Sequence, residues 1–197
     1  MRSAISAKSL DQIFWSAHTY NGWADTPVQE SVVRDLYDLL KWGPTSANCG
    51  PARFVWVRST AGKAKLAGLA FEKNRPKILE APLTVIIGNN LDFADALPKL
   101  MPKNAEAMQK AFAQPGMSEV TAMRNGTLQG AYLIIAARAL GLDCGPMSGF
   151  DNTGVDQAFF AGTHIQSNFI CSVGYGKPDS VFPRNPSLSF EEAGHFE

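Results

Sequence analysis

The chain has 197 residues, of which 45% are hydrophobic, and its 18 basic side chains equal its 18 acidic ones in number. This length suits a single domain, residues 1–197, with a sizeable core. A formal net charge of zero gives no electrostatic reason to expect nucleic acid or an anionic membrane as a partner.

The apolar runs and the cysteines further limit the class of protein to which this chain can belong. The longest apolar run, Ala131 to Ala137, is far shorter than a membrane span. The opening residues lack the apolar stretch of a secretory signal. Cys49, Cys144 and Cys171 are odd in number and lack metal-type spacing. We therefore expect a reduced, cytoplasmic protein without a metal site.

Helical signals dominate the first half of the chain. A helix is expected from Ser9 to about residue 20, with apolar residues on one face. Thr26 and Gln29 are typical of a capping box for a second helix, which the pair Gly43-Pro44 ends. Alternating apolar residues at 54–57 predict a strand, and Thr60 is expected to cap a short helix.

The second half contains two apolar strands and a long helix. The run 83–88 predicts a strand buried on both faces, and 169–174 predicts another. Between 91 and 117 the pattern is irregular, and its methionines and phenylalanines are expected to pack a satellite cluster rather than to touch substrate. Ser118 is expected to cap a long helix through Ala139 that is central and buried. The apolar stripe expected on this helix is Leu128, Tyr132, Ile135 and Ala139.

Two stretches of small and polar residues stand out. The loop 43–50 joins a helix to a strand, and its hydroxyl and amide groups suit the edge of a planar, hydrogen-bonding ligand. The run 141–151 follows the long helix, and we expect a tight turn there into a helix capped by Asp151. No dinucleotide-binding glycine motif, phosphate loop or serine-hydrolase elbow occurs in the sequence.

Together, the runs Pro44-Thr45-Ser46-Ala47-Asn48 and Pro146-Met147-Ser148-Gly149-Phe150 resemble the FMN-dependent nitroreductase family. The fuller runs around them, with Asn21-Gly22-Trp23 upstream, resemble its RutE-like branch of malonic semialdehyde reductases. This resemblance covers about residues 10–190.

The resemblance implies an α+β fold, with a mixed, mostly antiparallel sheet flanked by helices around a long buried one. It also implies a homodimer with two FMN sites at the subunit interface. An extended C-terminal arm, 177–197, would reach the partner. The segment 91–117 matches a variable part of the family near the pocket and is expected to be a lid.

The resemblance further implies which residues bind the flavin. It predicts that the first loop borders the cofactor through Pro44, Thr45, Ser46 and Asn48. A second set is predicted to lie along the ring: Pro146, Met147, Ser148 and Gly149. A backbone N–H near Ser148 and Gly149 would donate to the flavin N5. No catalytic side chain is expected, because the flavin carries the redox chemistry.

At the phosphate end, the family has an arginine-containing segment early in the chain and a basic residue near its end. The early segment is here His18-Thr19-Tyr20-Asn21, so a titratable histidine stands where an arginine is expected. Arg184 matches the late position. Without the resemblance, His18 would be a helix-end surface histidine and Arg184 a solvated arginine on a tail.

Three further roles stay open. Trp23 is either a residue over the substrate pocket or a buried core tryptophan. Arg124 is a candidate for binding a substrate carboxylate. Cys49 and Cys144 are either nucleophiles or small packed thiols, and packing is favoured because neither has an obvious histidine partner.

The implied reaction has two steps: NADH or NADPH reduces FMN, and a small electron-poor acceptor is then reduced. The leading acceptor is malonic semialdehyde, which gives 3-hydroxypropionate. Two alternatives remain. One is a general reductase of nitroaromatics, quinones or enones, and the other is a flavin-binding protein without turnover.

Overall fold

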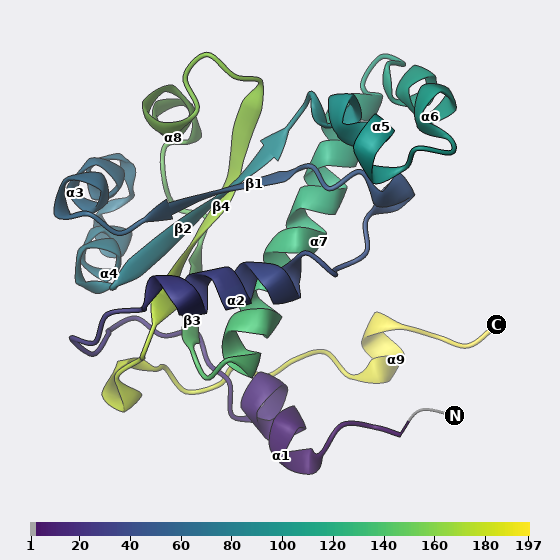
Figure 1. Ribbon diagram of the computed structural model, residues 1–197. Coiled ribbons are helices and arrows are strands. Elements are labelled where there is room, and N and C mark those ends of the chain that lie inside the picture. Colours follow the sequence, from purple (N-terminus) through teal and green to yellow (C-terminus); the bar gives the residue numbers. More distant parts are fainter. Residues whose placement is uncertain (1–2) are drawn as a thin grey trace.

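The computed structural model describes residues 3–197 and is built on a four-stranded sheet (Figure 1). Its strands, in the order β1-β2-β4-β3, are β1 (Ala52–Val57), β2 (Leu83–Asn90), β4 (Ile165–Gly174) and β3 (Asp143–Met147). All three strand pairs are antiparallel, in agreement with the expected mostly antiparallel sheet. Within residues 3–197, parallel pairing is limited to an isolated bridge between Thr19 and Cys144 beside β3.

β3 occupies a run where we expected only a tight turn. Pro146 lies within this strand. A proline is tolerated there because β3 is an edge strand, so the N–H groups that point away from β4 pair with no neighbouring strand. β2 is central instead and is buried from residue 83 to residue 89, as its continuous apolar run predicts.

Helices cover both faces of the sheet (Figure 1). One face is covered by α2 (Glu30–Leu40) and α7 (Met117–Ala139). The other is covered by α3 (Thr60–Leu69), α4 (Arg75–Glu80) and α8 (Asn152–Phe159). Val85 and Ile87 belong to the first core and Ile86 to the second, because successive strand residues point to opposite faces. The α+β architecture is therefore confirmed.

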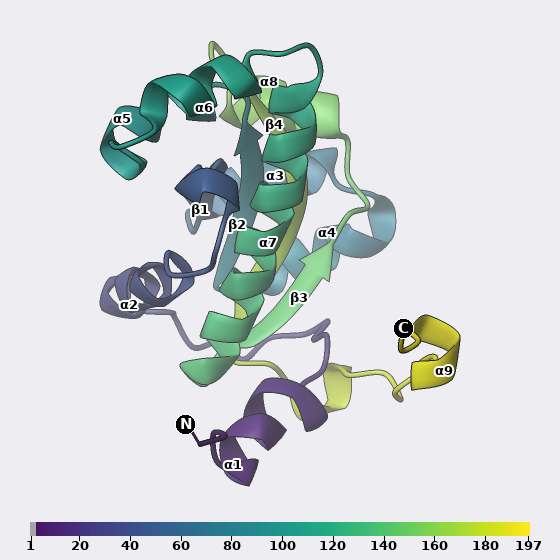
Figure 2. The ribbon, with the colours of Figure 1, turned by 90° about the vertical axis from the view of Figure 1, so that its right-hand side faces the viewer.

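The long helix α7 packs closely on the sheet, which it crosses in Figures 1 and 2. A Cβ atom at Gly126 would lie 2.0 Å from the Asn89 side chain, and one at Gly130 would lie 2.5 Å from the Phe169 ring. The helix is central and buried along the side that packs on the sheet, whereas Met123 and Leu128 on its other side are exposed. The predicted stripe lies at the edge of the core, since Tyr132 packs against the first core and Leu128 is 46% exposed.

Two predicted helix caps shift by one or a few residues. α2 begins at Glu30 behind Gln29, which makes no side-chain cap, and not behind Thr26. α3 is capped by Ser59, the residue before Thr60, whose hydroxyl accepts a hydrogen bond from the Gly62 N–H at 3.0 Å. Asp151 caps α8 as predicted.

The segment 91–117 is more helical than its sequence suggested. It contains η4 (Phe93–Ala96), α5 (Leu97–Leu100) and α6 (Ala105–Phe112). The rings of Phe93 and Phe112, with centroids 5.1 Å apart, lie in a satellite core against which Met101 and Met108 pack. The predicted satellite cluster is confirmed, except that Met117 is 42% exposed.

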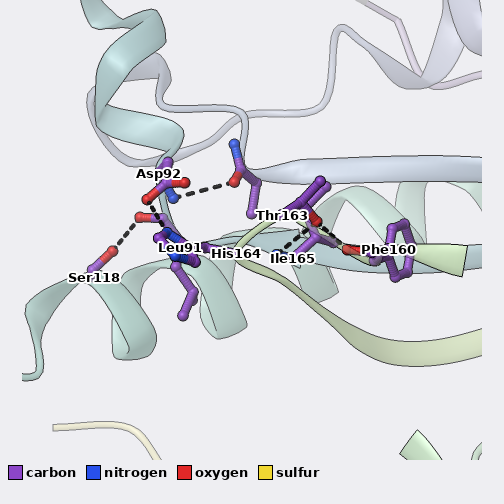
Figure 3. Close-up of polar contacts among 8 residues, drawn as sticks. Leu91, Asp92, Ser118, Phe160, Thr163, His164 and Ile165 are labelled. Atoms are coloured by element: carbon purple, nitrogen blue, oxygen red, sulfur yellow. Dashed lines mark hydrogen bonds and ion pairs between the residues drawn. The ribbon is translucent and has the colours of Figure 1, made fainter. Parts of the chain in front are cut away.

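Polar contacts tie the start of this segment to His164, just before β4, and to Ser118 just after the segment (Figure 3). The Leu91 N–H donates to the His164 carbonyl at 2.9 Å, and the Asp92 carboxylate lies 3.0 Å from His164 Nδ1. Ser118, expected to be a helix cap, instead donates its hydroxyl to the Leu91 carbonyl. α7 begins one residue earlier, at Met117.

The first helix and the C-terminal tail both lie at the end of the molecule opposite α5 and α6 (Figures 1 and 2). The first helix begins at Ala7 rather than Ser9, as α1 (Ala7–Leu10), and continues as a π-helical turn, η1 (Asp11–Trp15). The tail after residue 177 is extended apart from two short turns, η5 (Pro178–Ser180) and α9 (Phe190–Ala193).

Candidate functional site

A hollow of about 540 Å³ lies between the first helix, the end of α7 and the C-terminal tail. We call it the arm hollow. It is lined by Phe14, Ala17, His18, Thr19, Asn21, Arg138, Phe182, Pro183, Arg184 and Asn185. The structure thus brings together residues of the early and late segments that the resemblance predicts for the phosphate end: His18, Thr19 and Arg184. The lining includes two arginines and no carboxylate, which suits an anion.

Arg184 also connects the tail to the first helix. Its guanidinium donates to the carbonyls of Trp15 at 2.9 Å and Ala17 at 2.7 Å, just beyond that helix. Such free carbonyls attract a cation at a helix C-terminus. Tyr20 lies next to the hollow rather than in its lining, and its backbone N–H donates to the Cys144 carbonyl at 3.0 Å.

A second hollow, of about 370 Å³, lies between β3 and α7, and we call it the strand hollow. Its lining is Thr127, Ala131, Ile134, Pro146, Met147, Ser148 and Phe169. Most of these side chains are apolar, as the wall beside a flat ring would be. Three of the four residues predicted to lie along the flavin are therefore neighbours in one wall.

Gly149, the fourth, follows directly and is fixed by residues that the sequence did not indicate. Its carbonyl accepts from the Phe71 N–H at 2.9 Å and from the Asn74 side-chain amide at 3.0 Å. A Cβ atom at Gly149 would lie 2.8 Å from that amide nitrogen, so only glycine fits without a shift. Among residues 3–197 the Gly149 N–H has no hydrogen-bond partner, which leaves it available to a ligand.

The loop after α2 borders a third hollow, of about 450 Å³, which we call the loop hollow. Thr45 and Asn48 line it together with three cations, Lys41, Arg53 and Lys99, and no carboxylate. Pro44 and Ser46 flank these residues in the chain without being part of the lining. The Asn48 amide donates to the Leu100 carbonyl at 2.8 Å, so it connects the loop to α5.

The loop after α2 has an unusual backbone, and two side chains of α7 hold it in place. Ala47 and Asn48 both have a backbone φ angle of 51°, in the left-handed region that non-glycine residues seldom occupy. Asn125 accepts the Ser46 N–H at 2.8 Å, and Gln129 accepts the Ala52 N–H at 2.8 Å. Both side chains are buried, so these bonds fix the loop firmly.

The two predicted flavin-binding stretches lie at opposite edges of the sheet. Pairing joins Met147 of β3 to Ile170, Ile170 to Ile86, and Ile86 to Val55 of β1. Three strand spacings, about 14 Å, therefore separate the β3 edge from the β1 edge, beyond which the loop lies. Within one chain the stretches do not share a hollow.

Comparison with known proteins identifies the family. Residues 16–176 match the model of the nitroreductase family. A Caulobacter sp. (strain K31) protein, provisionally named NADH dehydrogenase/NAD(P)H nitroreductase, is 58% identical over 96% of each chain. HadB of Ralstonia pickettii, with the same provisional name, is 54% identical over 94% of this chain and 95% of its own. The chain belongs to the nitroreductase family.

The fold agrees with this assignment. A provisionally named nitroreductase from Exiguobacterium sibiricum 255-15, solved in complex with FMN, superposes with a TM-score of 0.86 at 18% identity. That match covers 100% of this chain and 99% of the other. As a nitroreductase, the protein is a flavin-dependent oxidoreductase that uses FMN with NAD(P)H, as the sequence predicts.

Some of the predicted side chains lie outside the three hollows of this nitroreductase. Trp23 is only 1% exposed, and its ring packs against Gly145 and Gly174, in agreement with the alternative of a core tryptophan. Arg124 lies on the exposed side of α7. Within residues 3–197, no helix is both long and apolar enough to cross a membrane, and no three metal-binding side chains cluster.

The cysteines are all buried, as packed thiols are. Burial raises the pKa of Cys49 above its ordinary value. A hydrogen bond with Cys144, together with burial, raises the pKa of Cys171. A raised pKa lowers the thiolate fraction, so neither Cys49 nor Cys171 is activated as a nucleophile.

Proposed function

We propose that this nitroreductase reduces malonic semialdehyde to 3-hydroxypropionate. The observation that carries the proposal is the lining of the loop hollow. Lys41, Arg53 and Lys99 line it, and the lining has no carboxylate. Lys41 pairs with Asp38 outside the lining, so Arg53 and Lys99 are the cations left for a substrate. These two cations favour a small carboxylate acceptor over an uncharged one.

FMN fits the donors on the other side of the molecule. The arm hollow has cations and hydrogen-bond donors for a phosphate, and the strand hollow has apolar walls for a ring. When bound, FMN would supply the transfer of reducing equivalents from NADH or NADPH to the acceptor. His18, Thr19 and Arg184 would hold its phosphate.

The protein would contribute orientation and electrostatics. Pro146, Met147 and Ser148 would fix the plane of the ring, and the free Gly149 N–H would donate to the edge where negative charge accumulates on reduction. A donor whose position is fixed in advance stabilises such charge without reorganisation. The Asn74 amide would keep the Gly149 peptide in place through its carbonyl.

A homodimer would complete this site. Pro44, Thr45, Ser46 and Asn48 lie beyond the β1 edge, far from Gly149 of the same chain, so the loop of the partner would border the flavin. The exposed face of α7, with Met123 at 52% and Leu128 at 46% exposure, offers apolar surface for a partner. The tail 177–197 would act as the arm, since Phe182, Leu188 and Phe196 are exposed along it.

The segment 91–117 would serve as a lid over the acceptor. Ala96, Lys99 and Leu100 belong to the wall of the loop hollow, and Asn48 donates to Leu100. Arg53 is the best placed cation for the acceptor carboxylate. Its NH1 group donates to Gly50 and Ala52 carbonyls, at 3.0 and 2.9 Å, which holds the guanidinium beside the loop. Arg124, the cation proposed from sequence, is the second candidate.

Steady-state kinetics with two acceptors test the proposal. Arg53→Gln should raise KM for malonic semialdehyde by about 10-fold and leave KM for an uncharged nitroaromatic within about twofold. Lys110→Gln, in an exposed ion pair of α6, is the control. A wild-type protein that turns over the nitroaromatic with the higher kcat/KM would instead be a general nitro, quinone or enone reductase. No NAD(P)H oxidation with any acceptor would indicate a flavin-binding protein without turnover.

A further inference from the structure

One face of α7 borders two hollows in succession. Thr127, Ala131 and Ile134 line the strand hollow, and Arg138 lines the arm hollow. Their spacings of four, three and four residues put all of them on one side of the helix. Ile134 and Arg138 are one turn apart, about 6 Å along the axis. A ligand with a ring in the first hollow would therefore have its far end near Arg138.

The arm hollow lacks a fixed cation at the position where one is expected. A histidine, His18, stands there, and Arg138 brings a guanidinium to the same lining. Arg138 is half-buried, so its charge is screened less than that of an exposed arginine. The Asp143 carboxylate is close enough to feel this charge, but it accepts the Gly176 N–H at 2.9 Å and does not pair with Arg138 within hydrogen-bond distance.

Arg138 also has donors to spare. One nitrogen, NH1, donates to the Ile13 carbonyl at 3.1 Å, which fixes the side chain. Arg184 uses its NH2 group on two carbonyls. Since a guanidinium has five N–H groups, Arg138 can keep its contact with Ile13 and still bind a phosphate through the others.

We infer that Arg138 binds the phosphate of FMN and supplies the permanent charge that His18 does not. This inference rests on the FMN site proposed above. Neither the motifs around residues 18 and 184 nor the apolar helix pattern indicates the residue. Its role follows from the place of the C-terminal turn of α7 beside the arm.

The test compares two flavins that differ only in the phosphate. Flavin-free protein is titrated with FMN and with riboflavin, and binding is followed by flavin fluorescence. Arg138→Gln should weaken FMN binding by about 10- to 100-fold and leave riboflavin binding within about twofold. Arg138→Lys should recover part of the FMN affinity, because it keeps the charge but not the fork of donors. Arg34→Gln, in an exposed ion pair of α2, is the matched control.

Three other outcomes would contradict the inference, and each points to a different cause. Equal loss of FMN and riboflavin binding in Arg138→Gln, with a lower melting temperature, would mean that Arg138 only fixes the first helix through Ile13. Unchanged FMN binding would exclude it from the phosphate site while the proposed function stands. Wild-type protein that binds neither flavin would refute the proposed function itself.

Discussion

Arg184 joins the C-terminal tail to the first helix and belongs to the arm hollow at the same time. Arg184→Ala removes a cation from the proposed phosphate site and two hydrogen bonds from the tail. We expect FMN retention to fall by about 10-fold. The flavin-to-protein ratio after gel filtration measures it, with Arg34→Ala as control. An unchanged ratio would exclude Arg184 from the site.

Single residues also show how far the site follows from sequence. His18, Thr19 and Arg184 could be assigned because they fall in short runs that resemble a family. Arg138 and Asn125 could not, because each works through a contact with a distant segment, such as the Ser46 N–H, 79 residues from Asn125. Asn48 is predicted to border the flavin, and nothing in the sequence indicates that its amide also donates to the Leu100 carbonyl of α5.

Among the elements, α7 depends on close contact with the sheet. Gly130→Ala would put a Cβ atom 2.5 Å from the Phe169 ring. We expect a loss of about 1–3 kcal/mol in unfolding free energy, although alanine is the better helix former. Gly68→Ala in α3 is the matched control, since nothing lies within 4 Å of its Cβ position. It should stabilise the protein by up to about 1 kcal/mol.

Denaturant unfolding of both variants gives the comparison. If Gly130→Ala proved as stable as Gly68→Ala, the helix would not pack on the sheet as closely as its glycines indicate.

The tie between the segment 91–117 and His164, just before β4, should depend on pH. The hydrogen bond and negative charge of Asp92 raise the pKa of His164 above its ordinary 6.5 (Figure 3). A raised pKa in the folded state means that the stabilisation is complete below about pH 6.5 and is lost as pH rises through the folded-state pKa. Asp92→Asn should lower the pKa of His164, as measured by NMR titration of its imidazole. An identical titration in both proteins would argue against the ion pair.

Sequence patterns located most elements but misjudged their surroundings. Periodicity predicts a stripe through Leu128 and Tyr132, but it cannot tell which end of such a stripe is covered, and only Tyr132 packs against the core. β3 was missed because Gly145 and Pro146 are turn residues in most contexts. Its edge position, which only the tertiary fold determines, allows them in a strand.

At the scale of the whole molecule, we predict from the exposed apolar face of α7 that two copies of the protein associate through it. We expect wild-type protein to sediment as a dimer and Leu128→Glu to sediment as a monomer, because a buried unpaired carboxylate is costly. Ala64→Glu, on the exposed side of α3, should remain dimeric. A wild-type monomer, or a dimeric Leu128→Glu, would contradict the proposed interface.

The distance between the loop hollow and the β3 edge has a genetic consequence. If each site takes its loop from one subunit and its strand end from the other, a chain carrying Arg53→Gln and a chain carrying Arg138→Gln damage different halves of a site. In a mixed dimer, both lesions fall in the same site and the other site is intact. At limiting substrate and FMN, co-expression of the two alleles should therefore give more malonic semialdehyde reduction than either allele gives alone. If each site instead lay within a single chain, both sites of the mixed dimer would carry a lesion, and co-expression would give no such gain.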